Sequence, residues 1–205
     1  MKNNLTSQQM GKIKNLFADR VRFNKVERLV YSHDMGMMPE QVRALIQCTP
    51  DAIVQPISTQ EVINIIKIAQ EEKIPIVPRG AGSAGFGGSV PAKAGIVIDF
   101  VRMNKIIDID KEDMTATVES GVVWQNLEGE LSKRGLTLRT YPSSSDSTVG
   151  GWVAQGGNGY GGYEYGDFRQ NIVSVDVVLP TGELKSFSGS EIDKVYSLCG
   201  ITGLM

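Results

Sequence analysis

The stretch of residues 78–91 lies between two prolines and carries five glycines, Gly80, Gly82, Gly85, Gly87 and Gly88. Glycine adopts positive φ and lets a ligand approach the backbone, because it has no Cβ. A run of such residues can turn several backbone N–H groups toward one point and so form a concavity that binds anions. We call this stretch the first glycine loop. We interpret it as a site for the pyrophosphate of a dinucleotide, although a flexible surface loop explains the same residues equally well.

The spacing of Gly80, Gly82 and Gly85 matches the Gly-x-Gly-x-x-Gly fingerprint of Rossmann folds. That fingerprint requires a strand, a tight turn and a helix whose N-terminus meets the phosphates. Residues 86–91 are rich in glycine and end at a proline, so they cannot sustain that helix. A Walker A loop is excluded as well, because no Gly-Lys-Ser/Thr follows. Backbone amides alone would therefore have to hold the anion.

A second glycine region spans residues 142–159, where small polar residues lead into Gly150 and Gly151. A short helix is expected next, with Ser147 or Thr148 as its cap, and its N-terminus would be a second place for phosphate oxygens. Three tyrosines follow at 160, 163 and 165, and ordinary surface packing explains them better than stacking on a ligand. The only histidine, His33, has no nucleophile or metal-ligand partner nearby in sequence, which favours a structural hydrogen-bonding role.

The elements around these regions alternate between strands and helices. Residues 6–30 predict one or two amphipathic helices, capped by Thr6 or Ser7. Ser58 and Glu61 fit a capping box, with Glu61 reaching back to the cap, for a helix running to about residue 72. Strands at 51–56 and 74–77 flank that helix, so residues 51–78 predict a β-α-β unit that delivers the first glycine loop at a strand's carboxyl end. Downstream, the pattern predicts strands at 95–100, 172–179 and 184–187, a hairpin of 106–110 with 115–120, and helices at 123–134, 147–155 and 191–199.

The bulk composition is that of an ordinary globular protein of 205 residues, with 41% hydrophobic and 21% charged residues. A net charge of −2 gives no reason to expect nucleic acid or an anionic membrane as a partner. The two cysteines, Cys48 and Cys199, cannot build an iron–sulfur or zinc site within the chain. The chain has no apolar leader and no run near the ~18 apolar residues of a membrane span, so we expect a cytoplasmic protein without a disulfide.

Four motifs in order resemble the FAD-binding domain of the p-cresol methylhydroxylase / vanillyl-alcohol oxidase family, also called FAD-binding type 4. The resemblance covers about residues 30–205 and is strongest to the glycolate oxidase / D-lactate dehydrogenase and alkylglycerone-phosphate synthase branches. It implies an α+β fold of two lobes, one a β-α-β lobe and one a mixed or antiparallel sheet with flanking helices. The lobes would span about 49–105 and 106–205, after an N-terminal helical segment at 1–48. The motifs are residues 50–62, 78–91, 147–153 and 177–183.

The resemblance also implies which residues hold FAD. Residues 79–84 would bind the pyrophosphate through main-chain N–H groups, and the second glycine region would take the other side of the phosphates and the flavin end. Residues 155–158 would lie along the cofactor, and the closing turn at 200–205 near its adenine and ribose, although Cys199 and Ile201 depart from the family's pattern there. The expected cofactor-binding residues are Pro78, Arg79, Gly80, Ala81, Gly82, Ser83, Ala84, Pro142, Ser143, Ser144, Ser147, Thr148, Gly150, Gly151, Gln155, Gly156, Gly157, Asn158, Gly200, Gly203 and Leu204.

Some members of the family tether FAD to a histidine in the first glycine loop. Here Ser83 and Ala84 follow Gly82 with no histidine nearby, so the resemblance implies non-covalent FAD and no metal site. The implied function is the FAD-binding part of a 2-hydroxy-acid dehydrogenase that passes electrons from its substrate to FAD and on to a partner. An iron–sulfur or cap-bearing subunit is the kind of partner that the resemblance implies. Two alternatives stay open: a flavin-binding electron-transfer subunit without a substrate, and an alkylglycerone-phosphate synthase-like enzyme. The substrate cap of the family lies C-terminal to this domain and is absent here, so no catalytic acid or base is named.

Overall fold

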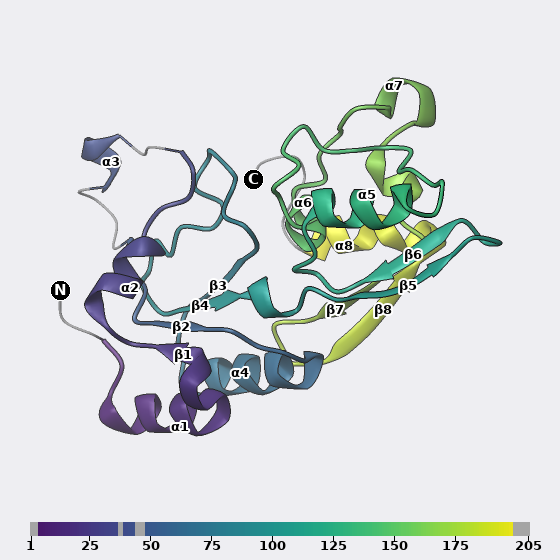
Figure 1. Ribbon diagram of the computed structural model, residues 1–205. Helices are drawn as coiled ribbons and strands as arrows, with labels where there is room; N and C mark the ends of the chain where they lie inside the picture. Colours follow the sequence, from purple (N-terminus) through teal and green to yellow (C-terminus); the bar gives the residue numbers. More distant parts are fainter. Residues whose placement is uncertain (1–3, 37–38, 44–47, 199–205) are drawn as a thin grey trace. The chain divides into compact units, whose positions relative to one another are not determined.

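The computed structural model describes residues 4–36, 39–43 and 48–198, and the chain divides into two compact units (Figure 1). The first unit consists of residues 1–102 with 178–183, and the second of residues 103–177 with 184–205. Among the described residues, no helix is both long enough and apolar enough to cross a bilayer.

The first unit is built on a four-stranded sheet in the order β1-β2-β4-β3. Its strands are β1 (Val21–Arg22), β2 (Ala52–Val54), β3 (Ile76–Arg79) and β4 (Ile96–Asp99). β1 runs antiparallel to β2, whereas β2 and β3 each run parallel to β4. Every residue of β2 and β4 is buried, as expected for parallel strands covered on both faces. β3 is an edge strand, which explains how it accommodates Pro78, a residue without a backbone N–H.

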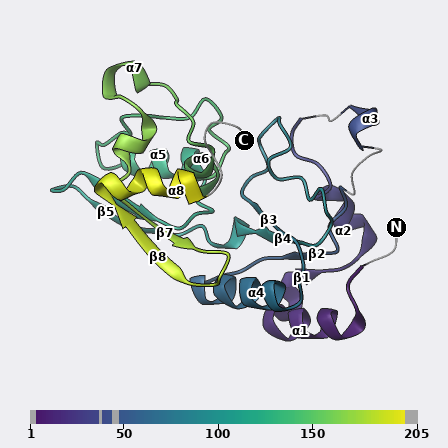
Figure 2. The same ribbon diagram turned by 180° about the vertical axis from the view of Figure 1, so that it is seen from behind.

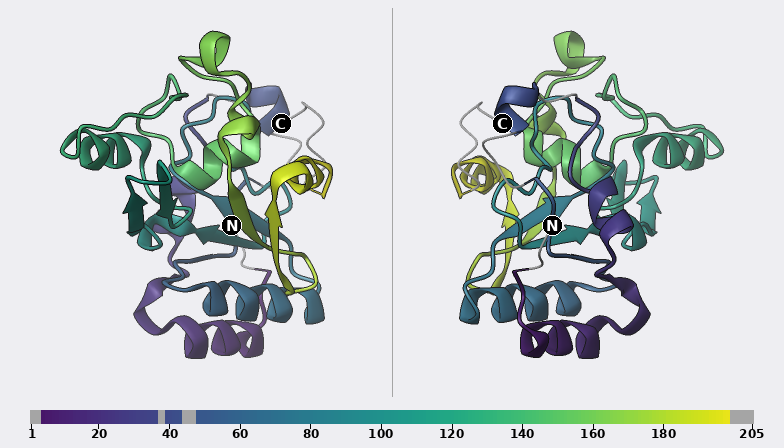
Figure 3. Two further views of the ribbon diagram at one scale, coloured as in Figure 1. Left: turned by 90° about the vertical axis from the view of Figure 1, so that its right-hand side faces the viewer. Right: turned by 90° about the vertical axis from the view of Figure 1, so that its left-hand side faces the viewer.

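Helices α1 (Ser7–Phe17) and α4 (Thr59–Glu71) lie side by side against this sheet (Figure 3). Ile13 and Phe17 of α1 and Ile65 of α4 pack on the apolar side chains of β2 and β4. Thr6 caps α1 in a complete capping box with Gln9, and the Ser58 side chain accepts from the Glu61 N–H. Both predicted caps are confirmed. The shorter helices α2 (Lys25–Val30) and α3 (Glu40–Arg43) complete the unit.

Residues 6–30 form two helices, which agrees with the prediction of one or two. They are separated at Ala18, which takes a positive φ of 51°, and by β1, which pairs with β2 before α2 begins after its cap, Asn24. Two other local predictions were wrong. The strand expected at 74–77 starts two residues later and extends through Arg79. The carboxylate of Glu61 does not reach back to Ser58: it accepts from the Ile57 N–H at 2.9 Å and pairs with Arg20.

The second unit contains the predicted hairpin, formed by β5 (Ile106–Asp110) and β6 (Thr115–Val118). Helices α5 (Trp124–Ser132) and α6 (Val149–Gln155) share one apolar cluster with it, with Trp124 and Trp152 among its buried members. The strands β7 (Ser174–Val178) and β8 (Leu184–Ser188) form a separate pair along which α8 (Ile192–Leu198) lies (Figure 2). Phe187 of β8 is buried against Ile192 and Val195 of α8. The short helix α7 (Gly162–Tyr165) precedes this pair.

Candidate functional site

The first glycine loop starts at the carboxyl end of β3, beside the carboxyl ends of β4 and β2. Arg79 is in register with Asp99, and Val54 is in register with Ile98, so Gln55 follows beside Asp99. Three polar residues from three strands therefore stand in one row at this edge of the sheet. Ligand sites of parallel sheets lie at such an edge, because the connecting loops open there.

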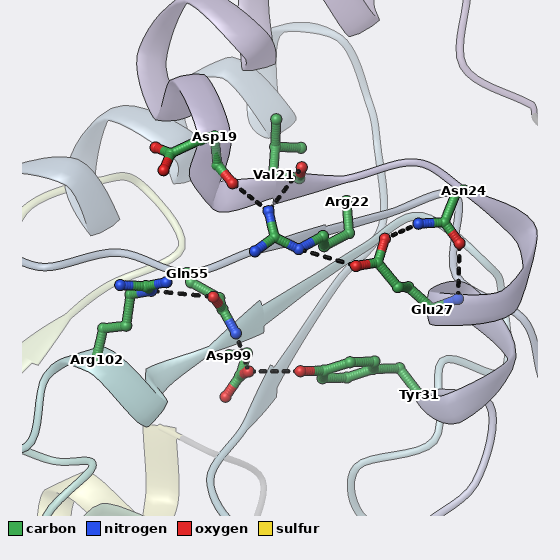
Figure 4. A network of polar contacts seen from close by, with 9 residues as sticks. All are labelled: Asp19, Val21, Arg22, Asn24, Glu27, Tyr31, Gln55, Asp99 and Arg102. Carbon is green, nitrogen blue, oxygen red and sulfur yellow. Dashed lines mark hydrogen bonds and ion pairs between the residues drawn. The ribbon is translucent and has the colours of Figure 1, made fainter.

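A hydrogen-bonded network joins Gln55 and Asp99 of this row to Tyr31 and Arg102 (Figure 4). The Tyr31 hydroxyl donates to Oδ2 of Asp99 at 2.7 Å, and Nε2 of Gln55 donates to the same oxygen at 2.9 Å. Nε of Arg102 donates in turn to Oε1 of Gln55 at 3.1 Å. Burial raises the pKa of Tyr31 to about 12, and the hydrogen bond to Asp99 acts in the same direction. Tyr31 therefore remains a neutral hydrogen-bond donor to a buried carboxylate at any physiological pH.

The side chain of Arg79 lies against the loop that follows it. Its guanidinium carbon is 5.2 Å from the centre of the Tyr31 ring, a cation–π contact, and Nη1 donates to the His33 carbonyl at 2.8 Å. A Cβ added at Gly82, where φ is +66°, would collide with the guanidinium. The loop thus has a positive charge packed against it. The positive φ of Gly82 favours glycine, and a side chain there would also displace the Arg79 guanidinium.

The loop's carbonyl groups are tied down by the segment that follows α2. The Met35 N–H donates to the carbonyl of Gly82 at 3.0 Å and to that of Ala84 at 3.1 Å. Gly36 approaches Gly85 so closely that a Cβ on Gly36 would collide with the Gly85 carbonyl. These contacts turn two carbonyl oxygens of the loop toward Met35 and leave them unavailable to a ligand.

The N–H groups in the first half of the loop, in contrast, have no acceptor among the described residues. Within residues 4–36, 39–43 and 48–198, the N–H groups of Gly80, Ala81, Gly82, Ser83 and Ala84 donate no hydrogen bond to the protein. Five consecutive free donors with the Arg79 guanidinium packed against them match the donor set that an anion needs. A diphosphate carries negative oxygens and no donors at neutral pH, so the residues present here fit that group. Among the described residues, no cluster of three or more His, Cys, Asp or Glu side chains could hold a metal.

In the second glycine region, the N–H groups at the start of α6 already have acceptors in the protein. Thr148 caps α6, as predicted, and accepts from the Gly151 N–H at 3.2 Å. The Val149 N–H donates to Val122 and the Gly150 N–H to Ser120, each at 2.8 Å, and the Trp152 N–H donates to the Thr148 carbonyl. The N–H groups of the first three helical residues therefore have acceptors, and that of Trp152 makes the first hydrogen bond of the helix itself. That this helix N-terminus offers amides to phosphate oxygens stays a prediction, although neighbouring protein groups already accept from the N–H groups of residues 149–151.

The serine stretch before α6 is tied to α5. The N–H groups of Trp124 and Gln125 donate to the carbonyls of Ser147 and Ser145, each at 3.1 Å. The Ser147 hydroxyl donates to the Ser144 carbonyl at 2.7 Å, which leaves Ser143 as an exposed neighbour and Pro142 buried before it. This stretch is held in one conformation, and its predicted contact with a cofactor stays a prediction.

The residues after α6 are divided between structural roles and exposed positions. Gly156 ends the helix in the left-handed conformation, with φ of 61°. Gly157 lies against the ring of Trp152, and the Asn158 side chain accepts from the Phe168 N–H at 3.2 Å, whereas Gln155 is exposed. The three tyrosines at 160, 163 and 165 are exposed, by 70%, 107% and 45%. The predicted positions Gly200, Gly203 and Leu204 lie outside the described residues.

The structure thus brings Pro78, Arg79 and residues 80–84 into one site of the first unit, and it adds three residues that the sequence analysis did not assign to that site. These are Tyr31, Asp34 and Met35, which precede the loop by some fifty positions and contact it directly or through Arg79. The available sequence signal was Asp34 two positions before Gly36, the pattern of a side chain that caps a turn. His33 has the structural role expected of it, since its Nδ1 lies 2.9 Å from the Asp34 carbonyl and its own carbonyl accepts from Arg79.

Comparison with known proteins bears directly on this site. Residues 50–188 match the family described as FAD binding domain. The chain is 38% identical over 158 residues to the glycolate oxidase subunit GlcD of Bacillus subtilis, an alignment that covers 77% of this chain and 32% of that protein. It is 32% identical over 203 residues to D-lactate dehydrogenase of Anaerostipes hadrus, covering 99% of this chain and 41% of that protein. The chain therefore spans about a third to two fifths of the length of these relatives.

Solved structures agree on the fold. Alkyldihydroxyacetonephosphate synthase, another name for alkylglycerone-phosphate synthase, aligns with a TM-score of 0.82 and 28% identity, over 98% of this chain and 41% of that one. p-Cresol methylhydroxylase aligns with a TM-score of 0.77 and 24% identity, over the whole of this chain and 38% of the other, which confirms the expected α+β fold. The cofactor expected from the sequence, FAD, is the ligand of the matched family. The chain belongs to the FAD binding domain family that includes relatives named as glycolate oxidase and D-lactate dehydrogenase.

Proposed function

We propose that the first glycine loop binds the diphosphate of FAD through the N–H groups of residues 80–84. One observation carries the proposal: five consecutive N–H groups have no acceptor among the described residues, while the carbonyls of Gly82 and Ala84 are held by Met35. Residues 80–84 are half-buried or exposed, so water satisfies the N–H groups until a ligand replaces it. Arg79 adds a positive charge against the loop, in contact with Tyr31, and thereby favours an anion further.

FAD is held without a covalent bond in this proposal, because the loop offers Ser83 and Ala84 where a tethering histidine would stand. The second glycine region contributes side-chain and carbonyl contacts to FAD, with Ser143, Ser144 and Gln155 as the candidates whose positions are exposed or half-buried. Gly150 and Gly151 remain predicted contacts, but their N–H groups are not donors to it, since each has a protein acceptor.

The activity we infer is that of the FAD-binding part of a 2-hydroxy-acid dehydrogenase. The support is the similarity to proteins named as a glycolate oxidase subunit and a D-lactate dehydrogenase. Bound FAD supplies the acceptor for a hydride from the substrate C–H bond. The residues of this chain bind and orient the cofactor, and a substrate-binding part and an electron acceptor are supplied outside residues 1–205. No residue of this chain is assigned as catalytic acid or base.

A second candidate function has its own support. The alignment with alkyldihydroxyacetonephosphate synthase has a higher TM-score than that with p-cresol methylhydroxylase, 0.82 against 0.77. A synthase of that class would use the same loop for FAD, so the two candidates differ in the substrate and not in the cofactor site. A flavin-binding subunit that only transfers electrons is the third candidate, and it too would use the same loop.

Reconstitution tests the proposal in two steps. Purified chain freed of ligand is titrated with FAD, and we expect the bound flavin to change its visible spectrum and to be released into the supernatant after acid precipitation. Flavin that stays in the precipitate would contradict non-covalent binding, and a chain that remains colourless would contradict the cofactor site. D-lactate or glycolate is then added under anaerobic conditions. The addition is made with and without the separately expressed part of a relative that lies outside the region aligned with this chain. Bleaching supports the dehydrogenase, and a lack of bleaching in both cases favours the alternatives.

A further inference from the structure

Asp34 has a buried carboxyl group, 5% exposed. One of its oxygens accepts a hydrogen bond from the first glycine loop, and the other accepts one from the segment that follows α2. Oδ2 accepts from the Gly87 N–H at 2.7 Å, and Oδ1 accepts from the Gly36 N–H at 3.1 Å. Gly87 has a φ of +80°, a conformation that only glycine adopts without strain. Asp34 therefore joins the segment after α2 to the C-terminal half of the loop, at a residue whose backbone is already unusual.

The same segment also holds the N-terminal half of the loop. Met35, the next residue, donates its N–H to the carbonyls of Gly82 and Ala84, and Gly36 packs against the Gly85 carbonyl. Consecutive residues 34–36 thus contact the loop at 82, 84, 85 and 87. In a trans peptide the C=O of one residue points away from the N–H of the next. Holding the carbonyls of Gly82 and Ala84 toward Met35 therefore turns the N–H groups of Ser83 and Gly85 to the opposite side.

We propose that Asp34 is the positioning residue of the diphosphate site: it sets the conformation in which the N–H groups of residues 80–84 face an anion, without touching the anion itself. The inference rests on the proposed function for the identity of the ligand. It goes further in assigning cofactor affinity to a carboxylate, a group that would repel a diphosphate if its oxygens faced it. In this structure both oxygens face backbone N–H groups instead, so the charge strengthens the two hydrogen bonds.

The chain offers a matched control in the same unit. Asp51 is 3% exposed, and its Oδ2 accepts from the N–H of Gly95, whose φ is +75°, at 3.0 Å. Both aspartates are buried, and both hold a glycine in the left-handed region. Only Asp34 contacts the first glycine loop, so a purely structural role predicts similar behaviour for the two residues and the positioning role predicts a difference.

The experiment compares the wild-type chain with Asp34→Ala, Asp34→Asn and Asp51→Asn. For each, the dissociation constants of FAD and of riboflavin, which has no phosphate, are measured together with the thermal unfolding midpoint of the ligand-free chain. We expect Asp34→Ala to raise the dissociation constant of FAD roughly tenfold or more, which is the scale of losing hydrogen bonds to a charged acceptor. The dissociation constant of riboflavin should change less than about twofold. Asp34→Asn, which keeps one acceptor oxygen, should fall between. Asp51→Asn should lower the unfolding midpoint while leaving the ratio of the two affinities unchanged.

Equal losses for FAD and riboflavin, or unchanged FAD binding in Asp34→Ala, would overturn the proposal. If Asp34→Ala does not fold, Asp34→Asn decides by the same ratio. Amide hydrogen exchange gives a readout that needs no cofactor: the N–H groups of Met35 and Gly87 should exchange faster in the Asp34 variants and not in Asp51→Asn. If the wild-type chain binds no flavin, the proposed function fails, and exchange alone then decides whether Asp34 sets the loop. Unchanged exchange there would reject its positioning role.

Discussion

In the first glycine loop a Cβ added at Gly85 or Gly88 would meet no atom within 4 Å, whereas in the second glycine region a Cβ at Gly159 would collide with the carbonyl of Tyr141. Gly150 is close to Ser120 in the same way, with 2.7 Å to its Cβ, and Gly161, just beyond that region, would collide with the carbonyl of Arg139. Glycines of the second region are needed for close approach of the chain to itself, while much of the first loop faces open space.

The two regions also differ in what becomes of their N–H groups. Residues 80–84 keep five free donors, while the four N–H groups that begin α6 all have protein acceptors. The same glycine-rich composition therefore leaves N–H groups free in one region and serves internal packing in the other. Substitutions in the first loop should alter cofactor affinity, and substitutions in the second should alter stability.

The largest expected effect is that of Gly159→Ala. Its Cβ would overlap a backbone carbonyl, which cannot move as a flexible side chain can, so we expect the chain to lose about 3 kcal/mol or more of its free energy of unfolding. Urea denaturation followed by circular dichroism measures it. Gly129→Ala in α5 is the control, because its Cβ meets nothing within 4 Å and removal of a helical glycine should stabilise the chain by about 0.5–1 kcal/mol. Equal stabilities of the two variants would show that Gly159 is not needed for the close approach of the chain.

The main effect of Gly82→Ala should be weaker binding of FAD. The added Cβ would displace the Arg79 guanidinium and strain a residue with φ of +66°, at a cost of about 1–3 kcal/mol in that segment. Because both changes disturb the donors of the diphosphate site, FAD binding should weaken by roughly tenfold or more. Gly88→Ala, in the same loop but open and with no positive φ, should bind FAD as the wild type does. Titration of flavin fluorescence measures both, and the comparison fails if the two variants bind alike.

Much of the fold was predictable because it depends on local signals. The caps Thr6, Ser58 and Thr148, the hairpin of β5 and β6 and the end of α5 near Gly135 all follow from residue types within a few positions. β1 was not predictable, because a two-residue strand is formed only by its pairing with β2 thirty residues later. β3 starts two residues later than predicted, because the Ile74 N–H donates to the Ala69 carbonyl at the end of α4 and not to a neighbouring strand.

The candidate site was predictable only in part, for the same physical reason. Glycine spacing identified residues 80–84 as potential donors, since that property belongs to the residues themselves. Whether the donors are free depends on partners far away in sequence, and these cannot be inferred from local pattern. Asp34 and Met35 hold the first loop from about fifty positions away, and Ser120 and Val122 take the N–H groups of α6 from about thirty positions away. The sequence predicted two amide sites, and the structure shows free N–H groups at the first and protein acceptors for most of those at the second.

Thr148→Val tests whether the N–H groups at the start of α6 serve the protein and not the cofactor. The substitution keeps the shape of the cap and removes the oxygen that accepts from the Gly151 N–H, so we expect a loss of about 1 kcal/mol in the free energy of unfolding. The ratio of FAD to riboflavin affinity should not change, because the first-turn donors of α6 serve the protein. An unchanged stability combined with weaker FAD binding would show that Thr148 meets the cofactor directly, and the contrast between the two regions would then be lost.

The smallest effect is expected for Glu61→Gln, and it depends on pH. Glu61 and Arg20 form a two-point ion pair at 2.5 and 2.6 Å, both side chains being 16% exposed, and this hydrogen bonding holds the pKa of Glu61 below its usual 4.5. A carboxylate with a lowered folded-state pKa contributes stability above its unfolded pKa and loses it as the pH falls through the folded value. At pH 7 the variant should therefore be less stable by about 1 kcal/mol, and the difference should shrink below pH 4.5.

Thermal unfolding of wild type and Glu61→Gln between pH 3 and pH 7 measures this difference, with Glu130→Gln as the control. The pKa of Glu130 is lowered as well, chiefly by its hydrogen bond to Lys133, but the side chain is 40% exposed and solvent screens the pair, so little change is expected. Because the Arg20–Glu61 pair supports α4 and contacts no residue of the first glycine loop, FAD affinity at pH 7 should match the wild type. A parallel loss of affinity would mean that the loop's conformation depends on the stability of the whole first unit and not on residues 34–36 in particular.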